Sequence, residues 1–167
     1  LLFISSSNAQ VQALFHDKGE LKTMVSRWEL DSTVARGTFL VTPYKAIYAL
    51  PFVWPSNRNE QPHSGNTSPE YIAPPENDYN AIEMKFQLSF KTKILQGFLW
   101  GHADLWVAYT QISYWQIYNT ELSRPFREIN YEPEIILNFP VKFNVLGFKT
   151  RMIGASFDHM SNGKSYP

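Results

Sequence analysis

The sequence predicts an all-β fold built as an antiparallel sheet, and it leaves open whether that sheet forms a soluble protein or a transmembrane β-barrel. Aromatic residues make up 16% of the 167 residues, in a chain that is only 44% hydrophobic. No stretch approaches the roughly 18 consecutive apolar residues of a membrane-spanning helix, which excludes a helical membrane protein. The clearest pattern, at residues 83–91, alternates apolar and polar side chains with a period of two.

Charge and cysteine content exclude further classes. Lys+Arg 15 balances Asp+Glu 15, so the chain lacks the basic footprint of a nucleic-acid-binding protein. With Cys 0, disulfide frameworks, cysteine zinc sites and thiol nucleophiles are also excluded.

The amino-terminal region is expected to precede the sheet. Residues 1–9 end in Ser7-x-Ala9, a small-x-small pattern typical of the cleavage site of a secretory signal, so they are interpreted as a signal remnant. The alternative is a frayed terminus. Residues 10–37 are interpreted as a periplasmic segment with a possible short helix, and residues 38–167 as the amino-terminal, truncated part of a barrel.

The first predicted strand occupies residues 38–41 and 44–50 and is broken at Pro43, because β-branched and aromatic residues flank a proline that cannot donate to a ladder. A long polar loop follows at residues 54–81, which contain five prolines. The strand at 83–91 places Met84, Phe86, Leu88 and Phe90 on one face and polar residues on the other. Its nine residues suit a strand that crosses a bilayer at a tilt.

The remaining elements alternate strands with connections of two kinds. A short connection at 96–102 leads to a strand at 104–118. A polar stretch at 119–130 separates that strand from one at 133–141, and a turn at 144–147 leads to a fifth strand at 148–161. Long external loops and short periplasmic turns are typical of outer-membrane barrels, so 54–81 and 119–130 are expected outside the cell. Five strands cannot close a barrel, since such barrels contain about eight strands or more, so further strands are expected after Pro167.

His159 and Ser161 form the candidate catalytic pair. In a strand, positions i and i+2 lie on one face, here shared with the apolar Ile153, Ala155 and Phe157. In a membrane barrel this face meets lipid, where polar groups are costly and tend to be functional. A serine beside an imidazole is the nucleophile–base pair of acyl-transfer enzymes. The alternative is an incidental His and Ser at a loop boundary.

Two further residues belong to this hypothesis. The backbone N–H of Gly163 lies close enough in sequence to Ser161 to help stabilise an oxyanion. Gln111 shares its parity with Leu105 and Val107, so in a membrane it faces lipid and is best satisfied by a second chain. If the parity is reversed, Gln111 instead lines a polar lumen.

Three segments carry a resemblance to a known family. They are Tyr109–Gln116, Ser123–Glu134 and His159–Ser165, and through them the sequence resembles outer-membrane phospholipase A of Gram-negative bacteria over about residues 31–167. The resemblance implies a twelve-stranded antiparallel barrel in the outer membrane, active as a calcium-bound homodimer. It implies hydrolysis of phospholipid acyl esters at either glycerol position, and of lysophospholipids.

The resemblance also assigns roles to residues. Ser161 matches the nucleophile, His159 the general base and Gly163 the oxyanion-hole amide. Ser123 matches a contributor to the partner's calcium site, Lys164 a residue whose backbone carbonyl binds calcium, and Gln111 the glutamine at the dimer interface. Tyr166 departs from an aspartate common in the family, and the asparagine that orients the base is expected beyond Pro167.

The resemblance therefore predicts that this polypeptide alone is inactive and that a complete barrel containing it is the enzyme. Two other classes stay open. One is a non-enzymatic barrel, such as a porin or an adhesin, in which His159 and Ser161 have no catalytic role. The other is a soluble β-sandwich binding protein, since alternation alone does not distinguish a lipid-facing side from a core-facing one.

Overall fold

The structure is a computed structural model that describes residues 23–61, 65 and 77–163, so the signal remnant expected at residues 1–9 lies outside the described residues. The chain divides into two compact units. Among the described residues, one unit comprises 23–36 and 140–152, and the other comprises 37–139 and 153–163 apart from the gaps. Each unit is described by itself.

The smaller unit contains the short helix expected in the amino-terminal segment. Helix α2 (Met24–Trp28) begins after Thr23, whose hydroxyl accepts a hydrogen bond from the Ser26 N–H at 3.2 Å. A single 3-10 turn, η1 (Ser32–Val34), follows. Lys142 forms an ion pair with Asp31. No helix in the described part of the chain is both long and apolar enough to span a membrane.

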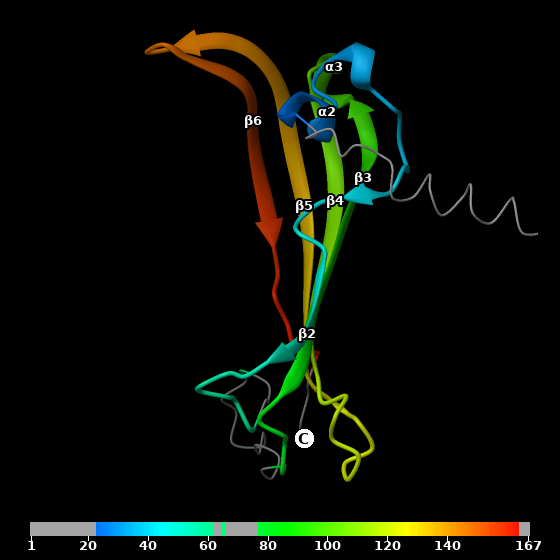
Figure 1. The fold of residues 1–167 in the computed structure, drawn as a ribbon. Helices are drawn as coiled ribbons and strands as arrows, with labels where there is room; N and C mark the ends of the chain where they lie inside the picture. The colour runs from blue at the N-terminus through cyan, green and yellow to red at the C-terminus, as the bar shows by residue number, and fades with distance from the viewer. Residues whose placement is uncertain (1–22, 62–64, 66–76, 164–167) are drawn as a thin grey trace, which may run out of the picture. The chain divides into compact units, whose positions relative to one another are not determined.

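The sheet contains six strands and confirms the predicted antiparallel all-β class. They are β1 (Thr42–Pro43), β2 (Tyr48–Val53), β3 (Glu83–Gly97), β4 (Ala103–Trp115), β5 (Phe126–Val145) and β6 (Phe148–Asp158). Their order is β1-β3-β4-β5-β6, with β2 also paired to β3, so the described sheet is open (Figure 1). A short helical turn, α3 (Phe98–Gly101), joins β3 to β4. Long connections thus alternate with short ones, as predicted.

The first strand differs from its prediction. Thr42 and Pro43 pair with Lys91 and Phe90, so Pro43 is the last paired residue of β1, and the predicted break begins directly after it. Strand β1 has only β3 beside it, and a proline is tolerated at such an edge because its missing N–H has no ladder partner to lose. The interruption falls at residues 44–47, and residues 38–41 are not in a strand.

Strand ends also differ. Strand β3 continues to Gly97 rather than Lys91, and β5 begins at Phe126 rather than Pro133. Residues 126–132 had the polarity of a loop, but in the sheet their polar side chains lie on its buried side. Strand β4 ends at Trp115 rather than Tyr118 because the Gln116 N–H binds the Pro125 carbonyl at 3.0 Å, where the chain turns back.

The two faces of the sheet differ in polarity in the opposite sense to a soluble β-sandwich. On one face, here called the buried face, Lys93 is 1% exposed and Asn138 0%, and Ser89 and Thr110 share a hydrogen bond of 2.8 Å. On the opposite, exposed face, Phe90 is 36% and Ile135 53% exposed. A polar inside and an apolar outside are typical of membrane barrels and the reverse of a soluble sandwich.

We expect a cation on the exposed face to be far more damaging than one on the buried face. In a complete barrel in lipid bilayers, Phe90→Lys at the middle of β3 should lower the free energy of unfolding by about 2–4 kcal/mol, because the ammonium is placed in hydrocarbon. Gln87→Lys is the matched control on the buried face, where Gln87 donates to the Ala46 carbonyl at 2.7 Å and a lysine can do the same. Equal destabilisation by both substitutions in a denaturant titration would contradict this orientation.

Candidate active site on the exposed face

Backbone pairing fixes the position of Ser161. Strand β6 ends at Asp158, but the chain rejoins β5 at an isolated antiparallel bridge between Tyr131 and Ser161. The Tyr131 N–H donates to the Ser161 carbonyl at 2.7 Å, and the Ser161 N–H donates to the Tyr131 carbonyl at 2.9 Å. The His159 N–H donates to the Pro133 carbonyl at 3.2 Å. Both candidate residues are therefore bound through their backbone to β5.

The register extends these pairs across the sheet. Tyr131 is opposite Gln111 on β4, and Gln111 is opposite Leu88 on β3. Directly opposed residues of antiparallel strands share a face. Ser161, Tyr131, Gln111 and Leu88 therefore form one row on the exposed, apolar face, and neighbouring strands lie about 4.8 Å apart.

His159 lies in the next row. Its backbone partner Pro133 is opposite Tyr109, which is opposite Phe90. The arrangement thus puts an imidazole and a hydroxyl beside aromatic and aliphatic side chains rather than among the buried polar groups.

The turn after Ser161 is closed by a glycine that no other residue replaces without strain. Gly163 has φ +64, and its N–H donates to the Ser161 hydroxyl oxygen at 3.1 Å. A Cβ at this position would lie 2.9 Å from Cε2 of the Tyr131 ring. The N–H predicted to be the oxyanion donor thus binds the hydroxyl predicted to be the nucleophile.

The His159 and Ser161 side chains share no hydrogen bond among those of the described residues. Both lie on one face, His159 exposed and Ser161 partly exposed, and the Ser161 hydroxyl is engaged by Gly163 instead. Hydrogen bonds between catalytic groups are often long or absent without substrate and form in the reacting complex.

Gln111 is bound within its own strand. Its Oε1 accepts from the Tyr109 hydroxyl at 3.0 Å, and its Nε2 donates to the Ser113 hydroxyl at 3.0 Å. A primary amide has two donors and two acceptor lone pairs, so these bonds use half of its capacity. Gln111 lies two strands from Ser161, at about 10 Å.

The predicted calcium ligands are described only in part. Ser123 has φ 59 and its N–H binds the Thr120 carbonyl at 3.2 Å, while Lys164 and Tyr166 lie outside the described residues. Calcium takes six to eight oxygen ligands, and the described residues hold no group of three or more His, Cys, Asp or Glu side chains that could bind a metal. The hydroxyl of Ser123 has the right chemistry for one ligand of a shell shared with other segments, not for a complete site.

Two features were not predicted from the sequence. Tyr131 contacts both Ser161 and Gly163, and a cluster of Glu83, Gln116 and Arg127 lies almost fully buried at the same end of the sheet. Nothing in local spacing points to Tyr131, because its contacts are long-range. For the cluster, the sequence did contain one indication, namely charged residues within strands that otherwise alternate.

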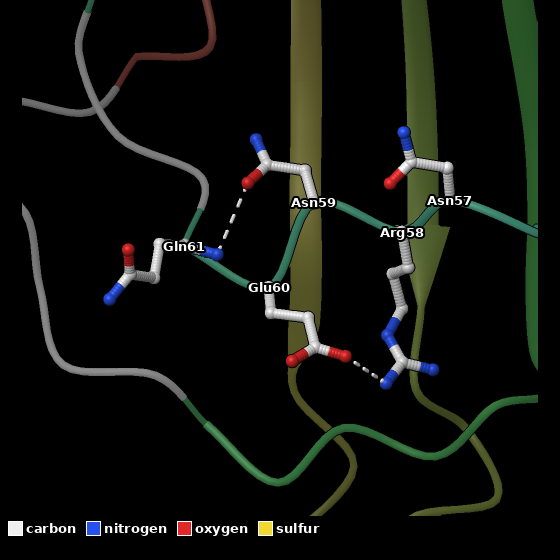
Figure 2. A pocket seen from close by; sticks show the side chains of 5 residues that line it. All are labelled: Asn57, Arg58, Asn59, Glu60 and Gln61. Carbon is white, nitrogen blue, oxygen red and sulfur yellow. Dashed lines mark hydrogen bonds and ion pairs between the residues drawn. The ribbon is translucent and has the colours of Figure 1, made fainter.

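A polar hollow also lies in the loop after β2. It is lined by the side chains of residues 57–61, and Figure 2 shows Glu60 paired with Arg58 at 2.6 Å and the Gln61 N–H bound to Asn59. The five described residues that line it include no serine, histidine or cysteine, so they offer no nucleophile–base pair. The row that contains Ser161 therefore remains the candidate active site.

Comparison with known families gives a match over most of the chain. The model of the family described as Phospholipase A1 matches residues 24–167. A putative phospholipase A1 of Neisseria meningitidis serogroup B is 40% identical over 145 residues, which is 84% of this chain and 37% of the relative. A phospholipase A1 of Klebsiella pneumoniae is 36% identical over 129 residues, which is 77% of this chain and 42% of the relative. The chain thus spans about two fifths of the length of these relatives.

Solved structures agree with the fold. Outer membrane phospholipase A from Escherichia coli has a TM-score of 0.59 at 33% identity, over 77% of this chain and 50% of that one. The Salmonella typhi outer membrane phospholipase, solved as a dimer with bound calcium, has a TM-score of 0.58 at 28% identity, over 87% of this chain and 52% of that one.

The geometry at Gly163 predicts a specific strain. Gly163→Ala places an alanine in the left-handed region, at about 1–2 kcal/mol, and adds a clash with Tyr131. We expect hydrogen–deuterium exchange of the 161–163 backbone to rise by about tenfold or more, since 1.4 kcal/mol is a factor of ten.

Gly147→Ala is the control, because Gly147 has φ +86 but nothing within 4 Å of a Cβ there. Hydrogen–deuterium exchange around the substituted residue should rise less in Gly147→Ala than in Gly163→Ala. Adding Tyr131→Leu to Gly163→Ala should reverse the part of the rise at 161–163 that is due to the clash. Wild-type exchange in Gly163→Ala would show that the turn is not closed as described.

Proposed function

The chain belongs to the phospholipase A1 family of bacterial outer-membrane enzymes, and on that premise we propose that it is the amino-terminal part of a serine hydrolase that cleaves acyl esters of glycerophospholipids in the outer leaflet. The substrates are diacyl phospholipids, attacked at either glycerol position, and lysophospholipids. The observation that carries the proposal is the row on the exposed, apolar face, in which Ser161 is paired with Tyr131 and Tyr131 with Gln111.

The proposed reaction uses groups of this chain in named roles. The Ser161 hydroxyl oxygen bonds to the ester carbonyl carbon while its proton passes to the His159 imidazole. The Gly163 N–H turns from the Ser161 oxygen to the developing oxyanion, a donor typically worth about 2.7–4 kcal/mol. The ester C–O bond then breaks, and His159 returns the proton to the leaving lysolipid oxygen. Water attacks the acyl-serine with His159 again as base, which releases the fatty acid and restores the serine.

Location explains the substrate class. A nucleophile that faces hydrocarbon meets the molecules of the bilayer, whereas a water-soluble ester would have to enter that layer first. A residue that orients His159 is proposed to be an asparagine in the part of the barrel after Pro167. The β5 residue opposite His159 is Pro133 and the one opposite Ser161 is Tyr131, so neither β5 partner offers a carboxylate for that role.

We propose a calcium-dependent homodimer as the active form. The support is the related Salmonella typhi enzyme, whose structure is a dimer with bound calcium. Calcium supplies positive charge near a developing oxyanion. In this chain the Ser123 hydroxyl and the Lys164 backbone carbonyl are the proposed ligands, and the Gln111 amide, with half of its hydrogen-bonding capacity unused by Tyr109 and Ser113, is the proposed contact between subunits.

The activity is assigned to a complete barrel that contains this sequence, and the described sheet alone is proposed to be inactive. Its open edge leaves ladder groups that hydrocarbon cannot satisfy. The competing function is a porin or an adhesin with no reactive serine.

Covalent labelling tests the nucleophile. In the complete barrel, a fluorophosphonate probe should label Ser161, and Ser161→Ala should remove both the label and phospholipid hydrolysis. Ser156→Ala is the control, because Ser156 lies on β6 with the opposite parity and should keep wild-type labelling. An unlabelled wild-type protein that folds normally would favour the porin or adhesin function.

Calcium titration tests the metal and the dimer. Excess chelator should abolish hydrolysis, and Ser123→Ala should raise the calcium concentration for half-maximal activity by about tenfold, equivalent to about 1.4 kcal/mol. Thr120→Ala, a hydroxyl lost from the same turn, is the control. Sedimentation of the protein with and without calcium measures the dimer, and undiminished turnover in chelator would remove calcium from the scheme.

A further inference from the structure

Three buried polar side chains form a connected cluster at the end of the sheet where the long loops meet. Glu83 and Gln116 are 0% exposed and Arg127 is 4% exposed. Arg127 binds Glu83 through two hydrogen bonds, Nε to Oε2 at 2.9 Å and Nη2 to Oε1 at 2.7 Å. The Gln116 Nε2 donates to the same Oε2 at 3.0 Å. We call these three residues the latch.

A β-bulge aims Arg127 into the latch. Tyr114 is opposite Glu128 and Trp115 is opposite Phe126, so Arg127 is the extra residue on β5. A bulge of this kind redirects a side chain. Here the guanidinium lies 4.8 Å from the centre of the Tyr114 ring and binds Glu128 at 3.3 Å, on the buried face.

Two of the three latch residues, Arg127 and Gln116, bind the backbone of a loop. Arg127 Nη1 donates to the Asn59 carbonyl at 3.1 Å, in the loop segment of Figure 2. Gln116 accepts from the Asn80 N–H at 2.7 Å and donates to the Asn80 carbonyl at 3.2 Å. These bonds connect the strands to both described ends of the loop between β2 and β3.

The same network continues into the turn between β4 and β5. Asn119 is 3% exposed, donates to the Asp78 carbonyl at 2.9 Å and accepts from the Leu122 N–H at 3.0 Å. The Asn119 N–H binds the Gln116 carbonyl at 2.9 Å, and the Arg124 N–H binds the Asn119 carbonyl at 2.8 Å.

That turn stores backbone strain. Ser123 has φ 59 and Arg124 has φ 55, two consecutive non-glycine residues in the left-handed region. Such residues persist where surrounding structure over-determines them, and they cluster at functional sites. Several of the surrounding bonds lead to Gln116 or to a strand end, including Trp115 Nε1 to the Arg124 carbonyl at 2.9 Å and the Asn119 N–H to the Gln116 carbonyl.

We propose that the latch of Glu83, Gln116 and Arg127 positions Ser123, by holding the 119–125 turn in its strained conformation. The latch residues are positioning residues and do not themselves touch the metal or the substrate. The role of Ser123 in a calcium shell shared between subunits rests on the proposed function. The conformation of the 119–125 turn is independent of the proposed function, so each of the two claims can fail without the other.

The chemistry of the latch explains why it holds one geometry. A bidentate pair between a guanidinium and a carboxylate fixes both distance and direction, which a lysine could not do. Both groups are buried in the strands β3 and β5, so loss of either partner would leave an uncompensated buried charge. The pair therefore fixes the positions from which Arg127 and Gln116 bind the loops.

The experiment compares the latch with an equally buried ion pair at the other end of the same strands. In the complete barrel, Arg127→Met and Glu83→Gln break the latch, and Gln116→Leu is a milder variant that keeps the ion pair. Asp104→Asn is the control, because Asp104 is paired with Lys93 at 3.0 Å with both side chains buried and lies far along β4 from the turn. The first readout, independent of calcium, is hydrogen–deuterium exchange of the 119–125 backbone.

We expect exchange of that turn to rise at least tenfold in the latch variants and to stay at its wild-type value in Asp104→Asn. The calcium concentration for half-maximal hydrolysis should rise 10- to 100-fold in the latch variants, as for residues that orient metal ligands, with the rate at saturating calcium retained. A double variant, Glu83→Gln with Arg127→Met, should recover part of the protection because it leaves no lone buried charge.

Unchanged exchange in all three latch variants overturns the proposal, and so does an equal rise in Asp104→Asn, which would indicate general loosening. If the wild-type protein shows no calcium dependence, the proposed function loses its metal, and the exchange measurement still decides whether the latch positions the turn.

Discussion

The two-residue period of strands β3, β4 and β5 is the constraint on which the rest of the structure depends. Once Lys93, Thr110 and Asn138 lie on the buried face, every residue one position away is committed to the exposed face. A slip of one residue would exchange the faces completely. Pairs that span the strands oppose such a slip: Ser89 with Thr110 in the middle and Lys93 with Asp104 at one end.

The orientation of the candidate site follows from this constraint alone. Ser161 is bound to Tyr131 through two backbone hydrogen bonds, Tyr131 is opposite Gln111, and Gln111 is opposite Leu88. No side-chain interaction is needed to decide where the hydroxyl faces. It lies on the side where Phe90 and Ile135 are exposed, because the ladder carries that side from strand to strand.

The sequence predicted correctly those features that depend on the two-residue alternation within one strand. It did not predict features that depend on contacts between distant segments. Alternation at residues 84–90 predicted a strand and its apolar face, and the same parity predicted that His159 and Ser161 share a face. The predicted start of β5 was wrong for two reasons. Arg127 adds an extra residue to the ladder, and the residues around it are polar because they face the buried side of the sheet. The pairing of Thr42 and Pro43 with β3 was missed because pairing at a sheet edge depends on which strand has a neighbour, and spacing does not contain that information. The contact of Tyr131 with Gly163 joins residues on different segments, so only the fold reveals it.

Under the proposed function, substrate and a second subunit both approach the candidate site from the exposed face. The Gly163 N–H binds the Ser161 oxygen, and His159 has not engaged that oxygen among the described interactions. In the proposed reaction, an ester carbonyl that arrives from the membrane side would compete for the same N–H, and its approach would displace water from His159 and Ser161, which strengthens the hydrogen bonds formed there. A second subunit that docks on Gln111 would cover a surface about 10 Å from Ser161, within the length of an acyl chain. Under the proposed function, association and substrate binding therefore share one apolar surface, and neither can be altered there without affecting the other.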